Sequence, residues 1–415
     1  MSVSTPARRT APPPSPGTDT RWPPPIRALL AGTLIARSAG FAYPFLAYRM
    51  SGLGYSSVTA GLVLGSFGVG WLAGQWCAGW LTDRLGYRAA LLGTSVLGAV
   101  TLPLLAMGTG EGWLLIAAVA AGFGYDAPRP PISAAIVDLV EDPARRVAVS
   151  GWRLGAINIG AAATGGIGGL LADRVGYVLL VLANAASFLV LAAVAVPALP
   201  RRRRSPTVTA AAVPTRQALR DARLWLLCAS TLMAMTCAVG LMSVLPLLMS
   251  RAGLSASAYG WTQIANAFAV LVLTPFLTPI TCRWAGRPGP LLRAQAISAL
   301  TLGLGMGSTG LAHSTLGFAA AVTVAVPGEI TLYVVATELV TLLAPPHAVG
   351  IYHGAFGSTF GASVILAPLL AGWAMSQGGN STAGLSIVAC GGCGALLCLP
   401  LHFAMRGRQP RDGCA

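Results

Sequence analysis

The chain has 415 residues, of which 55% are hydrophobic and only 9% charged, and its mean hydropathy is +0.70. Soluble domains carry about 25% charged residues, so this composition excludes a soluble protein and indicates an integral membrane protein. The net charge of +15 rests on 27 basic residues, all of them arginine. A chain without lysine has neither a P-loop nor a Schiff-base lysine, which excludes P-loop ATPases and enzymes that depend on such a lysine.

Twelve apolar segments follow one another along the chain, each near the length of about 20 residues that a membrane-spanning helix needs. Because they are continuously apolar rather than alternating, they predict helices and not a β-barrel. The expected fold is therefore an all-α membrane protein with twelve transmembrane helices. The segments lie near residues 28–48, 57–80, 89–108, 113–140, 148–171, 178–198, 224–248, 258–281, 289–311, 316–344, 349–374 and 383–405.

The arginines gather in alternate loops, among them the run 201–204 and the pair Arg145 and Arg146. This positive-inside pattern places both termini in the cytoplasm and accounts for the charge without a nucleic-acid partner. It also divides the chain into segments of different kinds. We expect a disordered tail at 1–25, a six-helix bundle at 26–198, a cytoplasmic linker at 199–223, a second six-helix bundle at 224–405 and a tail at 406–415.

One short phrase occurs twice in the first half. Gly79 is followed by Asp83-Arg84-Leu-Gly86-Tyr, and 90 residues later Gly169 is followed by Asp173-Arg174-Val-Gly176-Tyr. Three apolar segments separate the two copies, so the two turns lie on opposite faces of the membrane. A motif that recurs with flipped topology indicates an inverted repeat of three helices, the building unit of many secondary transporters.

The first copy, Gly79-Trp-Leu-Thr-Asp83-Arg84-Leu-Gly86-Tyr-Arg88, resembles the loop signature of the major facilitator superfamily. Twelve spans, a long central loop and internal termini agree with this resemblance over nearly the whole chain. Asp126-Ala-Pro-Arg129-Pro, Arg153 with Asn158-Ile-Gly160, Pro327-Gly-Glu329 and Ala344-Pro-Pro are similar to segments of the twelve-span drug:proton antiporter branch. The resemblance implies two bundles around a central cavity lined by spans one, four, seven and ten.

The signature loop is expected to gate the cytoplasmic side. The resemblance implies that Asp83 caps the start of span eleven and that the basic residues meet an acid at the end of span four, here Asp138 facing Arg88. Gly86 permits a turn conformation that is closed to larger residues, and Gly79 permits close helix packing. These groups would close the cytoplasmic side in the outward-open state. The predicted gating residues are Gly79, Asp83, Arg84, Gly86, Arg88 and Asp138.

Four charged residues are expected near the middle of the membrane, where an ionised side chain costs about 2.5–3.5 kcal/mol and therefore faces a cavity or a partner. They are Arg37 in span one, Asp126 and Arg129 in span four and Glu329 in span ten, all on helices that line the expected cavity. Asp126 and Arg129 are three residues apart, on one face of a helix that neighbouring prolines should kink. Glu329 is the first candidate for a proton carrier and Asp126 the second. The alternative is two structural pairs, Glu329 with Arg37 and Asp126 with Arg129.

Span five is rich in small residues that suit close packing between helices. The residues singled out are Asn158, Gly160, Gly165, Gly168 and Gly169. In the antiporter branch that the chain resembles, a Gly-Pro-x-x-Gly-Gly segment associated with export stands here. Thr164-Gly165 replaces its Gly-Pro, which weakens the assignment as an exporter. The pair Cys390 and Cys393 is interpreted as packing residues in an apolar span, so neither a metal nor a cofactor is expected.

Together these features predict a proton-coupled secondary transporter of the cell inner membrane that works by alternating access and exports small amphipathic compounds. Its expected partners are a small-molecule substrate, protons and the lipid bilayer, and the chain is expected to be a monomer. A cavity rich in apolar side chains suits apolar or weakly cationic molecules. The alternatives are an importer or uniporter of a small metabolite and, from another class, a non-transporting membrane sensor with the same fold. An enzyme is not expected, since the sequence shows no nucleophile with a nearby base.

Overall fold

A computed structural model describes residues 22–140, 142–201, 220–284, 286–345 and 349–406. Every regular element within these ranges is a helix. Most of the expected tail at 1–25, most of the linker at 199–223 and most of the tail at 406–415 lie outside the described residues, so these assignments remain predictions.

The first half of the chain forms helices whose ends fall close to the predicted spans, with three additional breaks. These helices are α1 (Pro24–Ser38), α2 (Ala42–Gly52), α3 (Ser57–Leu85), α4 (Tyr87–Thr101), α5 (Leu104–Met107), α6 (Glu111–Tyr125), α7 (Arg129–Leu139) and α8 (Pro143–Ala198). The second half contains α10 (Ala222–Arg251), α11 (Ala256–Cys282), α12 (Pro288–Ser308), the 3₁₀ helix η1 (Thr309–Leu311), α13 (Thr315–Leu343), α14 (Val349–Leu396) and α15 (Cys398–Arg406).

The predicted span four is interrupted rather than kinked. Asp126 ends α6 with φ −126° and ψ 14°, and Arg129 begins α7 after Pro128. Proline lacks a backbone N–H and clashes with the preceding turn, so the proline-rich segment cannot continue α6. The expectation that Asp126 and Arg129 share one face of a continuous helix is therefore wrong, although the break still leaves their side chains close together.

Glycines with a positive φ stand at the turns between apolar segments. Gly86 has a φ of 80° and separates α3 from α4, and Gly176 has a φ of 74° inside the long α8. The left-handed region is open to glycine at little cost, which explains the residue that both copies of the repeated phrase share. A similar break at Gly378 and Gly379 divides α14.

Eight helical segments of the described chain are long and apolar enough to cross a membrane. They are Pro24–Gly52, Ser57–Leu85, Tyr87–Met107, Ala148–Ala198, Ala222–Arg251, Ala256–Thr281, Thr315–Leu343 and Ile351–Met405. Large apolar side chains on the outside of the molecule, such as Ile116, Leu271 and Leu316, are about three-quarters exposed, as expected for residues that face lipid tails. The protein is therefore a multi-pass membrane protein. The count of twelve spans remains a prediction.

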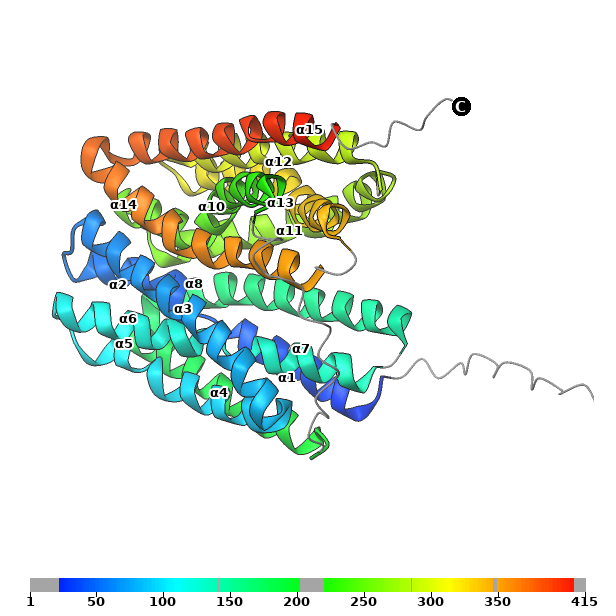
Figure 1. Ribbon diagram of the computed structural model, residues 1–415. Helices are drawn as coiled ribbons and strands as arrows, with labels where there is room; N and C mark the ends of the chain where they lie inside the picture. Colours follow the sequence, from blue (N-terminus) through cyan, green and yellow to red (C-terminus); the bar gives the residue numbers. More distant parts are fainter. Residues whose placement is uncertain (1–21, 141, 202–219, 285, 346–348, 407–415) are drawn as a thin grey trace, which may run out of the picture.

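The helices of the two halves form two groups that lie one above the other in Figure 1, with α1 to α8 in the lower group and α10 to α15 in the upper group. The groups meet mainly along two helix pairs, α3 with α14 and α8 with α11, and α2 also contacts α10. Glycines allow both approaches. A Cβ added to Gly61 would lie 2.5 Å from the carbonyl oxygen of Pro368, and a Cβ added to Gly169 would lie 2.7 Å from the Cα of Gly260.

Candidate functional site: a charged cavity between the helix groups

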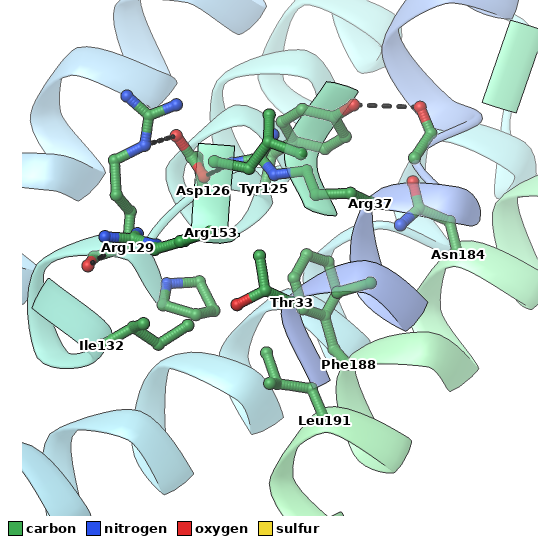
Figure 2. A pocket seen from close by; sticks show the side chains of 14 residues that line it. Thr33, Arg37, Tyr125, Asp126, Arg129, Ile132, Arg153, Asn184, Phe188 and Leu191 are labelled. Carbon is green, nitrogen blue, oxygen red and sulfur yellow. Dashed lines mark hydrogen bonds and ion pairs between the residues drawn. The ribbon is translucent and has the colours of Figure 1, made fainter. Parts of the chain in front are cut away.

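The predicted intramembrane charges of the first half meet at Asp126. Its carboxylate forms ion pairs with Arg37, from α1, and with Arg129, whose Nε lies 2.8 Å from Oδ2 (Figure 2). Asp126 is almost completely buried, whereas the side chains of Arg37 and Arg129 are 21% and 37% exposed. The pairing of Arg37 with Asp126 differs from the structural alternative considered above, in which Arg37 would pair with Glu329.

Hydrogen bonds from uncharged side chains stabilise the backbone at the helix breaks around this cluster. The Tyr125 hydroxyl donates to the carbonyl oxygen of Gly40 at 2.9 Å, and the Thr164 hydroxyl donates to the carbonyl oxygen of Arg37 at 2.6 Å. Gln75 donates to the carbonyl oxygen of Asp126 at 2.5 Å. Carbonyl groups that a helix break leaves free must find donors inside a membrane protein, and these three side chains supply them.

Arg153 of α8 joins the same cluster. Its Nη1 donates to the hydroxyl of Ser133 at 2.7 Å and its Nη2 to the carbonyl oxygen of Arg129 at 3.4 Å. Its Nε is buried and has no hydrogen-bond partner among the described residues. The side chains of the cluster surround a small cavity of about 30 Å³. Arg153, Arg37, Asp126 and Arg129 all line it (Figure 2).

A larger cavity of about 600 Å³ lies between the two helix groups. Arg129 lines both this cavity and the small one. The remaining walls come from α3, the beginning of α10 and the first turns of α14 and are mainly aromatic or small. They are Trp71, Leu72, Gln75, Trp76, Trp225, Ile351, Gly354, Ala355, Gly357, Ser358, Phe360 and Gly361. Sequence analysis missed these tryptophans, because scattered aromatic residues in apolar spans look like ordinary packing groups.

Glu329 lies on α13, half-buried and apart from the arginine cluster. No ion pair joins it to another group in the described part of the chain. No residue of α13 is among those that line the two cavities, so Glu329 lies outside both of them in the described part of the chain.

Arg88 of the predicted cytoplasmic gate has a partner other than the expected Asp138. Arg88 donates to the carbonyl oxygen of Leu199 at 2.8 Å, and no ion pair connects it to Asp138 within the described residues. Arg84 stacks over the ring of Trp80, with 4.2 Å between its Cζ and the ring centroid.

Two further parts of the gate differ in outcome. A Cβ added to Gly79 would meet nothing within 4 Å, so Gly79 does not serve close packing in this state. The segment 346–348, before the helix that Asp83 is expected to cap, lies outside the described residues, so this contact remains a prediction.

The second copy of the phrase is engaged at the opposite end of the molecule. Asp173 accepts hydrogen bonds from the backbone amides of Ala256 at 3.3 Å and Ser257 at 3.1 Å, at the beginning of α11. Arg251 donates to the hydroxyl of Ser57 at 2.9 Å and provides a further link between the halves at this end.

The glycines predicted to serve helix packing in span five do so on several sides of α8. A Cβ on Gly160 would lie 2.4 Å from the Cβ of Arg37, one on Gly165 would lie 2.2 Å from the Cβ of Gln263, and one on Gly168 would lie 2.6 Å from the ring of Phe45. Gly169 packs on α11 as described above. Asn158, predicted with them, is exposed. Within the described residues no group of three or more His, Cys, Asp or Glu side chains is placed to hold a metal ion.

Similar structures are transporters. A peptide transporter of the POT type matches with a TM-score of 0.74 at 18% identity, covering 92% of this chain and 95% of the other. The nucleoside transporter NupG matches with a TM-score of 0.70 at 13% identity, covering 91% and 98%. A bacterial homolog of the human lysosomal transporter Spinster, in an inward-facing and occupied conformation, matches with a TM-score of 0.69 at 15% identity, covering 92% and 96%. At these identities the likeness shows the fold.

No curated protein sequence matches the chain significantly. The model of the major facilitator superfamily matches residues 28–368, most of the sequence. The fold of this chain and its charged cavity agree with that match. The chain belongs to the major facilitator superfamily, a family of transporters rather than enzymes.

Proposed function

We propose that the protein is a proton-coupled secondary transporter that exports small amphipathic compounds by alternating access. The observation that carries this proposal is Glu329, a half-buried carboxyl on α13 without an ion-pair partner among the described residues. An ionised group in such a place is costly, so its protonation would respond to a change in its surroundings.

The proposed topology has twelve spans in two six-helix bundles with both termini in the cytoplasm. The breaks at Gly176 and Gly379 divide α8 and α14 into two spans each, and α6–α7 and α12 complete the twelve. The turn at Gly176 repeats the turn at Gly86 with the same positive φ, which supports an inverted three-helix repeat. The positive-inside distribution of arginine supports the orientation.

In this orientation the structure corresponds to an inward-facing state. The large cavity is lined by Trp225 and Ile351, which lie in the first turns of α10 and α14 at the proposed cytoplasmic end. The contacts of Asp173 with α11 and of Arg251 with Ser57 close the opposite end. The outward-facing state would then release these contacts and engage the gate around Asp83.

Between the two acids, the geometry favours Glu329 as the proton carrier. Asp126 has two guanidinium partners, and its protonation would leave Arg37 and Arg129 without a counter-charge. Glu329 would lose no such pair. A proton on Glu329 would remove its negative charge and thereby shift the equilibrium between the two states.

An importer or uniporter of a small metabolite is the alternative within transport, and a non-transporting sensor is the alternative from another class. All three share the fold. They differ in whether compound and proton move together, and in which direction.

The test is proton flux in proteoliposomes that contain a pH-sensitive dye, challenged with lipophilic cations, organic anions, antibiotics and sugars. We expect at least one compound to trigger proton movement in the wild type, and Glu329→Gln to abolish the proton movement. Glu338→Gln is the matched control: it lies on the same helix, where its carboxylate accepts a hydrogen bond from the Gly286 amide, and it should retain proton movement.

Loss of proton movement in Asp126→Asn but not in Glu329→Gln would reverse the assignment of the carrier. Equilibration of a labelled compound without proton movement would identify a uniporter. Absence of any flux, while the protein still binds one of the compounds, would favour the sensor.

A further inference from the structure

We propose that the large cavity binds an organic anion with a flat aromatic body, whose negative group is held by Arg129. The inference rests on the proposed transport function, because it names the substrate class of the same cavity. It replaces the expectation from the sequence that the cavity suits apolar or weakly cationic molecules.

The charge of the cluster is the first step. Arg37, Arg129 and Arg153 contribute three positive charges and Asp126 one negative charge, a sum of +2. Counting Glu329 as ionised still leaves +1. Unbalanced charge inside a membrane protein is costly. A bound anion would reduce this cost and a bound cation would increase it, so the cavity selects for negative charge.

The orientation of Arg129 is the second step. Its Nε lies 2.8 Å from Oδ2 of Asp126 (Figure 2), and its two terminal nitrogens donate no hydrogen bond within the described chain. Its side chain is more than one-third exposed and lines the large cavity. A guanidinium with two free donor groups in one plane matches the two oxygens of a carboxylate, phosphate or sulfonate.

The aromatic walls are the third step. Trp71, Trp76 and Trp225 line the same cavity as Arg129, and the Cζ of Arg129 lies 5.7 Å from the ring centroid of Phe360. Trp76 is 70% exposed, so a large part of its ring is accessible to a ligand. Flat apolar molecules pack well on such rings. The geometry therefore combines one anion-binding group with an aromatic platform.

The experiment uses three ligands of the same shape and different charge: 2-naphthoate, 2-naphthamide and 2-naphthylmethylammonium. Binding to the full-length protein in nanodiscs is measured by isothermal titration calorimetry. We expect the wild type to bind the naphthoate at least tenfold more tightly than either of the other two. This ranking needs no variant, so it tests the inference even where a substitution impairs folding.

Two variants then locate the binding group. Arg129→Gln should remove the preference for naphthoate, whereas Arg145→Gln, the same change at an exposed arginine outside the cavity, should retain it. Trp76→Ala should weaken binding of all three ligands and leave their ranking unchanged. Equal or tighter binding of the amide or the cation to the wild type would overturn the inference, as would an unchanged preference in Arg129→Gln.

The same three ligands separate this inference from the proposed function. Preferential binding of naphthoate without proton movement in proteoliposomes would contradict proton coupling and support the substrate class. Proton movement triggered only by the amide or the cation would support proton coupling and contradict the substrate class.

Discussion

The carboxylate of Asp173 accepts a hydrogen bond from the backbone amide of Ala256, although the two residues are 83 positions apart and belong to different helix groups. It also accepts one from the next amide, while the Ser255 hydroxyl accepts from Ala258. The first turn of α11 thus has side-chain acceptors for three amides that have no partner within the helix. The negative charge also lies at the positive end of the helix dipole. One half of the protein therefore caps a helix of the other.

Loss of this cap should open the end of the molecule at which it lies. We expect Asp173→Asn to shift the equilibrium by about fivefold toward the state in which the halves separate there, since a helix cap contributes about 1 kcal/mol. Spin labels on the exposed residues Ser51 and His313, in a cysteine-free background, would report longer distances. Asp83→Asn, the equivalent change in the first copy of the phrase, should not lengthen this distance. Unchanged distances in Asp173→Asn would contradict the role of the cap.

Close packing at the same end provides an independent prediction. In Gly169→Ala the new Cβ would lie 2.7 Å from the Cα of Gly260 and 2.8 Å from the Ala256 carbonyl oxygen, so α8 and α11 would have to move apart. We expect a lower melting temperature and the same opening as in Asp173→Asn. Gly155→Ala is the control on the same helix, because its Cβ would meet nothing within 4 Å. It should leave the melting temperature unchanged or raise it slightly, owing to the higher helix propensity of alanine.

The melting temperature should fall more when one member of the ion-pair cluster is lost than when two members of opposite charge are lost together. Asp126→Asn would leave Arg37 and Arg129 without their counter-charge, and breaking such a buried pair costs about 3–5 kcal/mol. We expect a large fall in the melting temperature in detergent. The double variant Arg37→Gln with Asp126→Asn removes one positive and one negative charge and should recover part of the loss. A double variant less stable than Asp126→Asn would show that Arg37 stabilises the fold in some other way.

Asp221 provides a prediction about pH. Partial burial opposes its ionisation, but hydrogen bonds from Arg223 and from the Tyr352 hydroxyl at 2.8 Å outweigh it and lower the pKa of Asp221 to about 2. A depressed pKa contributes stability that is present above the ordinary value of 3.8 and is lost as the pH falls toward 2. Asp221 therefore stays ionised between pH 5 and pH 8, and its hydrogen bond from Tyr352, which joins the start of α10 to α14, is unchanged over this range.

The variant Tyr352→Phe separates this contact from proton coupling. It should lower the melting temperature modestly and leave the pH profile of transport between pH 5 and pH 8 unchanged. A shifted profile would place the beginning of α10 in the proton pathway.

Much of the helical architecture could be predicted from local features. The sequence indicated a span at 316–344 and the structure has α13 at Thr315–Leu343, because a continuous apolar run bounded by polar residues leaves little freedom for the ends of a helix. The positive φ of Gly86 was likewise predictable from its place in a tight turn. The repeated phrase drew attention to Asp173, but its partner on α11 could not be read from the sequence.

The interactions that define the site depended on tertiary structure. Arg37 pairs with Asp126 and not with Glu329, and this pair joins two residues that are 89 positions apart in the chain. Arg153 reaches the cluster because glycines on α8 allow it to lie close to α1.

By itself the sequence determined the membrane location, most helix ends and the identities of the buried charges, since each follows from the cost of placing polar groups in lipid. Only the tertiary structure decided which charges neutralise one another, which remain free and which aromatic side chains face the cavity. These outcomes depend on the distance and rotation between helices that are far apart in the sequence, and no local pattern records either quantity.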